Sequence, residues 1–372
     1  MLKITCEGVY YKNGGFVPAK DGPAAGLPAP EKAREGTMAH AILKAHNTGD
    51  NMEELAIRFD AMASHDITYV GIIQTARASG MQAFPLPYVL TNCHNSLCAV
   101  GGTINEDDHV FGLSAAKKYG GEFVPAHQSV IHSYMRERYA APGRMILGSD
   151  SHTRYGAYGT MAIGEGGPEL ARQLLSKTYN IPYPKVIAIY LTGTPIPGVG
   201  PQDVALELIR STFKDGVVKN AVMEFFGPGV ANLSMDYRSG IDVMTTETTC
   251  LSSIWPADHT LKAHLAVLGR GEAFKPQAPA DGAYYDGLIE VELDKIRPMI
   301  ALPFHPSNAY TIKEFKENMD ELLHQVDEDT VRQLKLKNRP ASLREKIVDG
   351  KFRVDQGVIA GCSGGTYQNI VR

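Results

Sequence analysis

The chain has 372 residues, of which 44% are hydrophobic, 21% charged and 8% aromatic, a composition that excludes an intrinsically disordered protein. It carries 37 Lys and Arg against 41 Asp and Glu, and the resulting net charge of −4 does not favour nucleic acid or an anionic membrane as a partner. No apolar run reaches the roughly 20 residues of a membrane span, so we expect no membrane partner.

Strands and helices alternate along most of the sequence, which predicts α/β layers built on a largely parallel sheet. The apolar spacing predicts, in chain order, a helix over 51–62, strands over 67–73 and 87–92, a helix over 108–120, and strands over 144–148 and 185–193.

Prolines divide the chain into three predicted units, which are residues 1–184, 185–302 and 303–372. The third unit is expected to open with a helix over 312–326. It closes with a predicted strand, a glycine-rich turn around Cys362 and the start of a helix. Because the sequence stops as this helix begins, we expect the third unit to be incomplete.

The motif GSDSHT, at residues 148–153, follows the predicted strand 144–148 directly. In parallel α/β sheets, ligands bind at the carboxyl ends of the strands, so Asp150, Ser151 and His152 are candidates for a binding crevice. The same three residues would also suit a turn or a helix cap.

Three further polar residues are candidates from their local contexts. His132 lies on a predicted helix, Glu247 stands in a run of threonines, and Gln74 follows the predicted strand 67–73. Each also has an ordinary interpretation, respectively as a core or surface histidine, a helix cap and a polar group at a strand end. Two histidines and two carboxylates suit general acid–base chemistry, and the sequence leaves open which of them pair.

The five cysteines are irregularly spaced, and they are Cys6, Cys93, Cys98, Cys250 and Cys362. Their odd number argues against a disulfide framework and for a reducing compartment, so we expect a cytoplasmic protein. Cys93 and Cys98 lack the CxxC spacing of a zinc site. Cys362, followed by glycines in GCSGG, could be a cluster ligand, a nucleophile or an inert thiol.

Over most of its length the sequence resembles the aconitase superfamily of iron–sulfur hydro-lyases. The resemblance rests on five segments, which are HSYMRERYAAPGRMILGSDSHTRYGAYGTMAIGEGG, KVIAIYLTGTP, PQDVALELIR, DKIRPMIALPFHPSN and GCSGGTYQN. It implies three-layer α/β/α domains with largely parallel sheets, the third domain being incomplete here. It also implies dehydration and rehydration of a tricarboxylate or related hydroxy acid, with a [4Fe–4S] cluster as Lewis acid.

The resemblance also implies roles for individual residues. His132 matches a helix histidine that pairs with the aspartate of the DSH motif, here Asp150, and His152 is the histidine of that motif. Glu247 matches an acid that pairs with its histidine and faces the iron-bound water. Cys362 matches the first cluster ligand.

Four positions are expected to contact substrate, and they are Gln74, Ser151, Asn95 and Ser96. The last two stand where the family has an Asp–His pair, and they supply neither a carboxylate nor an imidazole. His94 is adjacent, but a residue shifted by one along a strand points to the other face.

The remaining two cluster cysteines of the family lie further along the chain than this sequence extends. We therefore expect the full-length protein to bind the cluster and this chain alone to lack both cluster and activity. Its partners would then be the missing C-terminal domains, in the same or a second chain. The alternative is a cluster-free relative that binds carboxylates or a protein partner.

Overall fold

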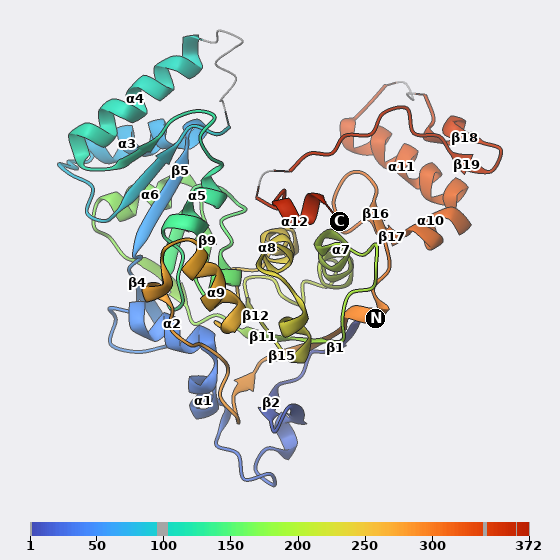
Figure 1. Cartoon of the computed structure of the whole chain (residues 1–372), viewed down its shortest axis with the longest axis horizontal. Helices are drawn as coiled ribbons and strands as arrows, with labels where there is room; N and C mark the ends of the chain where they lie inside the picture. Colours follow the sequence, from blue (N-terminus) through green and yellow to red (C-terminus); the bar gives the residue numbers. More distant parts are fainter. Residues whose placement is uncertain (1, 95–102, 338–340, 362, 372) are drawn as a thin grey trace.

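A computed structural model describes residues 2–94, 103–337, 341–361 and 363–371. Two five-stranded sheets form the centre of the molecule (Figure 1). The first has the strand order β7 (Glu122–Val124), β6 (Tyr88–Thr91), β5 (Ala61–His65), β8 (Met145–Gly148) and β9 (Met161–Gly164). All of its strand pairs are parallel, so the carboxyl ends of these strands meet at one edge.

Helices cover both faces of this first sheet because its buried side chains alternate between two cores. Met62 of β5 packs in the same core as α3 (Asp66–Ala78), α4 (Thr103–Tyr119) and α6 (Gly167–Leu174), whereas Ala63 packs in the core that contains α5 (Ile131–Arg138). The arrangement is the predicted three-layer α/β/α structure.

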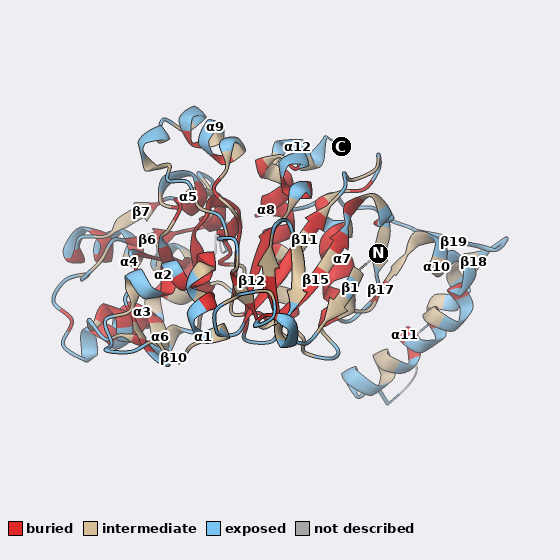
Figure 2. Ribbon diagram, turned by 90° about the horizontal axis from the view of Figure 1, so that it is seen from below, coloured by how far each residue is buried: buried red, intermediate tan, exposed pale blue. Residues whose placement is uncertain are grey.

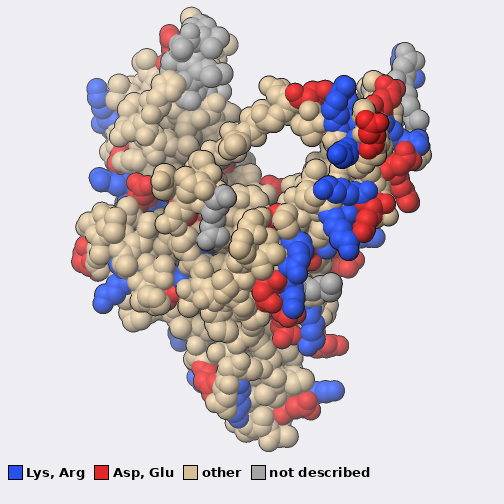
Figure 3. All heavy atoms as spheres, turned by 45° about the vertical axis from the view of Figure 1, so that its right-hand side comes forward, with Lys and Arg blue, Asp and Glu red and all other residues tan. Residues whose placement is uncertain are grey.

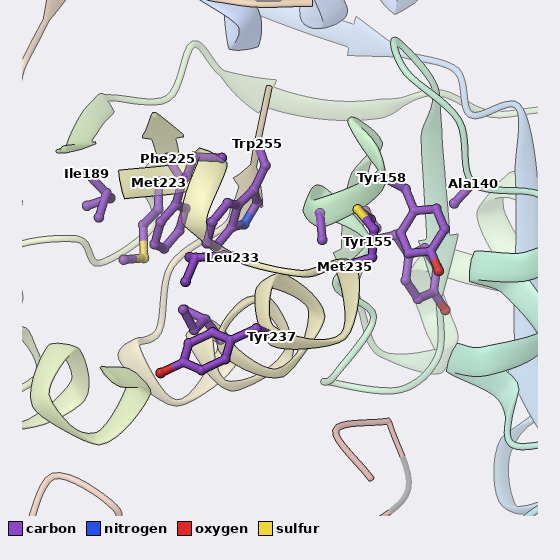
Figure 4. Packing of buried hydrophobic residues seen from close by; sticks show 14 of the residues in the cluster. Ala140, Tyr155, Tyr158, Ile189, Met223, Phe225, Leu233, Met235, Tyr237 and Trp255 are labelled. Atoms are coloured by element: carbon purple, nitrogen blue, oxygen red, sulfur yellow. The ribbon is translucent and has the colours of Figure 1, made fainter. Parts of the chain in front are cut away.

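The second sheet has the order β1 (Leu2–Thr5), β15 (Gly287–Glu292), β11 (Val186–Thr192), β12 (Val222–Phe226) and β13 (Ser252–Ile254). Its pairs are parallel except for the edge strand β1, which runs antiparallel to β15. Figure 2 shows the buried residues gathered in these strands and in α7 (Pro201–Thr212) and α8 (Met235–Met244). In Figure 4, Phe225 of β12 stacks on Trp255 with their ring centroids 4.3 Å apart.

The other face of the second sheet is covered by the beginning of the chain. The covering elements from the beginning of the chain are β2 (Val9–Lys12), β3 (Gly15–Pro18) and α2 (Met38–His46), and β14 (Tyr284–Tyr285) pairs with β2 in the same layer. The short helix α1 (Pro30–Ala33) precedes α2. Two further strands, β4 (Glu54–Ile57) and β10 (Tyr179–Pro182), pair antiparallel, and α9 (His259–Val267) follows β13. Within the described chain, none of the helices is long and apolar enough to cross a bilayer.

The third unit has a small core of its own around Phe315, Leu323 and Val326. Its elements are β17 (Ala309–Thr311), α10 (Ile312–Glu317), α11 (Met319–Leu334), β18 (Ile347–Val348) and β19 (Lys351–Phe352). Strand β16 (Met299–Ala301), just before the predicted boundary, pairs antiparallel with β17. From β19 the chain returns to the main body, where α12 (Tyr367–Ile370) contacts α8 (Figure 1). On the face drawn in Figure 3, acidic and basic side chains of this unit are interspersed.

Several predicted elements are confirmed, since β6, β8 and β11 lie within the strands expected over 87–92, 144–148 and 185–193. Two predictions are wrong, because 51–62 contains strand β4 and not a helix, and 67–73 belongs to helix α3 and not to a strand. The strand expected before Cys362 is also wrong for 354–361, where the structure has no strand. The division at residue 184 stays a prediction, although β1 at the chain start belongs to the second sheet.

Candidate active site

Three adjacent parallel strands deliver polar side chains to one point of the first sheet. His65 is the last residue of β5, His94 follows β6 by three residues, and Asp150 follows β8 by two. Because β6, β5 and β8 are neighbours in the sheet, the three side chains meet at its carboxyl edge. Their ligating atoms all lie within 4.8 Å of one another.

The Asp150 carboxylate is the centre of the site. Its Oδ1 accepts hydrogen bonds from Nε2 of His132 at 3.0 Å and from the backbone N–H of His152 at 2.7 Å. Its Oδ2 lies 3.2 Å from Nε2 of His94 and 3.7 Å from Nε2 of His65. Burial alone would raise the pKa of Asp150, but the hydrogen bonds from His132, His152 and His94 outweigh it and hold that pKa well below its usual range.

A second carboxylate continues the network on the side of the second sheet. Glu247, in the short helix η6 (Thr245–Thr248) after α8, accepts from Nε2 of His152 at 3.1 Å and lies 3.8 Å from His305. The hydrogen bonds to Asp150 and then to Glu247 raise the pKa of His152 to about 9, and the same contact lowers the pKa of Glu247.

The pKa values of the other histidines around Asp150 shift in opposite directions, according to how deeply each ring is buried. The hydrogen bond to Asp150 raises the pKa of His94 to about 10. Burial lowers the pKa of His65 to about 4, and it also lowers the pKa of His132. These pKa shifts favour the protonated form of His94 and His152, which face the carboxylates of Asp150 and Glu247, and the neutral form of His65 and His132.

His152 also lines a cavity of about 450 Å³, together with Gln202, Val243 and the glycine-rich segment before α12. Gly361 and Ser363, which flank Cys362, belong to this lining. Buried Arg136, one turn after His132 on α5, donates a 2.6 Å hydrogen bond to the carbonyl of Ser363. The helix that positions His132 therefore also holds the segment around Cys362.

The predicted site residues divide into three groups. His132, Asp150 and His152 are brought together with Glu247, and Ser151 lies beside them, with its Oγ 3.3 Å from Nδ1 of His152. Gln74 is exposed on α3, so its placement at a strand end is wrong.

Asn95, Ser96 and Cys362 lie outside the described residues, and their roles stay predictions.

The sequence did not lead us to predict His65 as a site residue, and strand alternation argued against such a role for His94. Asp66 in the first turn of α3 is a helix-start signal, and it would have placed His65 at the end of a preceding strand. The argument that excluded His94 relied on strand alternation, but β6 ends at Thr91 and His94 lies in the bend that follows.

The described cysteines do not fit an iron–sulfur cubane, which needs three thiolates. Cys6 is exposed, Cys250 donates to the carbonyl of Thr245, and Cys93 lies beside His94 with Sγ 3.3 Å from Nδ1. The group of possible metal ligands found among the described residues contains no cysteine.

Comparison with known proteins shows the family to which this chain belongs. The model of the aconitase family, aconitate hydratase, matches residues 40–372, and the chain belongs to this family. The mitochondrial aconitate hydratase of Schizosaccharomyces pombe is 33% identical over 281 residues, 71% of this chain and 35% of the relative. That of Saccharomyces cerevisiae is 30% identical over 309 residues, 76% of this chain and 40% of the relative.

The chain thus spans well under half the length of these relatives. Both relatives are named as mitochondrial, so a cytoplasmic location for this chain stays a prediction.

Proposed function

We propose that the protein is a hydro-lyase that adds water to, or removes it from, a hydroxy-polycarboxylate such as a tricarboxylate. The observation that carries the proposal is the network from His132 through Asp150 and His152 to Glu247, which opens on the 450 Å³ cavity. Its histidines and carboxylates are of the kind that general acid–base catalysis uses.

In the dehydration direction, a carbon–hydroxyl bond breaks and a proton leaves the neighbouring carbon. We assign to His152, held protonated by two carboxylates, the transfer of a proton to the hydroxyl, which departs as water. Asp150 and Glu247 keep their negative charge and hold the ring in place. The carbon-bound proton passes to a base that we assign to none of the described residues.

The cluster of the family enters this proposal only for the complete protein. There Cys362 would supply one thiolate, and the other two would come from domains outside this sequence, in the same or a second chain. When bound, the cluster would act as Lewis acid on the substrate hydroxyl. Since the described residues do not hold it, no catalytic step is assigned to it.

The test uses the full-length protein, reconstituted anaerobically with iron and sulfide, and a series of tricarboxylates and smaller hydroxy acids. We expect turnover, with kcat lowered by about 100-fold or more in His152→Gln because an acid–base group is lost. His46→Gln is the matched control, since His46 also pairs with a carboxylate, that of Asp60 at 2.9 Å, outside this network. Absence of turnover across the series, or full activity in His152→Gln, would overturn the proposal.

A second candidate is a cluster-free carboxylate-binding protein, which the replacement of the family's Asp–His pair by Asn95 and Ser96 favours. Calorimetric titration of the unreconstituted protein with tricarboxylates separates the two candidates. Binding heat without turnover after reconstitution would support the second candidate, and no heat across the series would exclude it.

A further inference from the structure

His65 is a buried polar side chain without a hydrogen bond to any described residue. It is only 5% exposed, its Nδ1 has no described partner, and its Nε2 lies 3.7 Å from Asp150, beyond hydrogen-bond distance. Of the two ring nitrogens, Nε2 is the one that lies near Asp150, and because no hydrogen bond to a described residue occupies it, it is available to bind an ion.

We propose that His65, His94 and Asp150 form a mononuclear site for a divalent first-row transition metal ion of the Zn²⁺ or Fe²⁺ type. Two imidazoles and one carboxylate are a ligand set that such ions prefer. Ligands about 2.1 Å from a tetrahedral ion lie roughly 3.4 Å apart. The distances from Oδ2 of Asp150 to Nε2 of His94 and of His65, 3.2 and 3.7 Å, bracket this value.

Neighbouring groups hold two of the three ligands in the required orientation. Oδ1 of Asp150 is occupied by His132 and by the N–H of His152, so an ion would bind at Oδ2, where it would replace the proton that Nε2 of His94 directs at this oxygen from 3.2 Å. Nδ1 of His94 lies 3.3 Å from Sγ of Cys93, and this contact leaves Nε2 as the ligand atom. Such outer partners fix the tautomer and direction of metal ligands.

The ion would have open coordination positions. The side chain of His94 is 32% exposed, whereas those of His65 and Asp150 are 7% and 12% exposed, so the site is open on the side of His94. The rings of His65 and His94 stack with centroids 3.8 Å apart, and binding requires the His94 ring to turn until both Nε2 atoms meet one ion.

This inference does not depend on the proposed reaction, because it concerns metal binding alone. The full-length protein is stripped with a chelator and titrated with Zn²⁺ by calorimetry and with Co²⁺ by visible absorption. We expect one equivalent of metal, bound without inorganic sulfide, and Co²⁺ bands typical of nitrogen and oxygen ligands. Sulfide analysis separates this ion from an iron–sulfur cluster.

Substitution of the ligands provides the specific test. We expect His94→Ala, at the partly exposed position, to weaken Zn²⁺ binding by more than about tenfold, since even loss of an outer partner costs about that much. His65→Asn should do the same, and circular dichroism checks that each variant is folded. His46→Ala, which removes a histidine outside the site, should bind as the wild type does.

Failure of the wild type to take up Zn²⁺ or Co²⁺ would overturn the inference even if no variant folds. Equal binding by the wild type and a folded His94→Ala would also overturn it. Metal uptake without hydro-lyase turnover would overturn the proposed function alone, and turnover without uptake would overturn this inference alone.

Discussion

Asp150 and Glu247 control the charge of His152, because the ring lies between the two carboxylates. The backbone N–H of His152 donates to Asp150, its Nδ1 lies 3.6 Å from the same carboxylate, and its Nε2 bonds to Glu247 at 3.1 Å. The pKa of His152 is raised to about 9 by these contacts. A histidine in this state remains a proton donor at neutral pH, as a general acid must.

Replacing Glu247 by Gln should lower the pKa of His152 towards 6.5, because one of its two anionic partners is lost. A raised folded-state pKa stabilises the fold fully below about pH 6.5, and this stabilisation is lost as the pH rises through about 9. In Glu247→Gln we expect the loss to be smaller and to be complete at a lower pH, because only the folded-state pKa changes. NMR titration of the His152 ring and urea unfolding across this pH range measure both effects.

The control for this prediction is Glu290→Gln, because Glu290 pairs with exposed Lys3 at 3.0 Å on the second sheet, outside the site. It should leave the His152 titration unchanged. A midpoint for His152 that is the same in wild type and Glu247→Gln would show that Glu247 does not hold its proton.

Among the secondary-structure elements, the short helix η4 (Gly156–Tyr158) follows the DSHT motif. It connects the half of the molecule built on the first sheet with the half built on the second. It packs against β13 and α8 of the second half. Asp242 of α8 is fully buried there and accepts from Ser253 at 2.6 Å and from Trp255 at 3.0 Å. A Cβ on Gly156 would lie 2.6 Å from Oδ1 of Asp242, so this contact requires glycine.

We expect Gly156→Ala to lower the free energy of unfolding by about 1–3 kcal/mol, because the added methyl group overpacks this contact. Gly71→Ala is the matched control, since Gly71 is exposed on α3 and a Cβ there would meet nothing within 4 Å. The control should be neutral or stabilising by up to about 1 kcal/mol, as alanine favours a helix. Urea unfolding compares the two, and equal stability would contradict the packing argument.

At the scale of the whole molecule, the segment that returns from β19 to α12 links the third unit to the parts of the chain that form the first and second sheets. Arg136 of the first half holds the carbonyl of Ser363 at 2.6 Å. Asn369 of α12 donates to the carbonyl of Asp236 in the second half at 2.8 Å. The cavity beside His152 is therefore built from residues of all three parts of the chain.

Arg136→Met should release this segment while keeping much of the buried volume. A hydrogen bond from a charged group contributes about 1.5–3 kcal/mol, so we expect amide exchange in the peptide carrying Ser363 to accelerate about tenfold or more. Exchange in β8 should not change. Arg172→Met serves as control because Arg172 is exposed and its contacts are with nearby residues, Glu169 at 3.4 Å and the carbonyl of Thr178 at 3.3 Å. Unchanged exchange near Ser363 would show that Arg136 does not hold it.

Local sequence was sufficient where a strand and its following motif are contiguous. The buried run 144–148 and the DSHT motif identified both β8 and Asp150. The helix that carries His132 was also predicted correctly from its local sequence. Residues 51–62 have the apolar spacing of a helix, but long-range pairing determines their structure. Strand β4 forms there because it pairs with β10, more than a hundred residues later in the chain. Tertiary context overrode local preference at 67–73 as well, because α3 packs on the first sheet.

The sequence by itself determined the family, the α/β layers and most members of the histidine–carboxylate network, since these depend on short motifs and periodicity. Only the tertiary structure decided that His65 and His94 join Asp150. The physical reason is that neighbourhood in a parallel sheet follows strand order, and β6, β5 and β8 become adjacent through crossovers that no local pattern reveals.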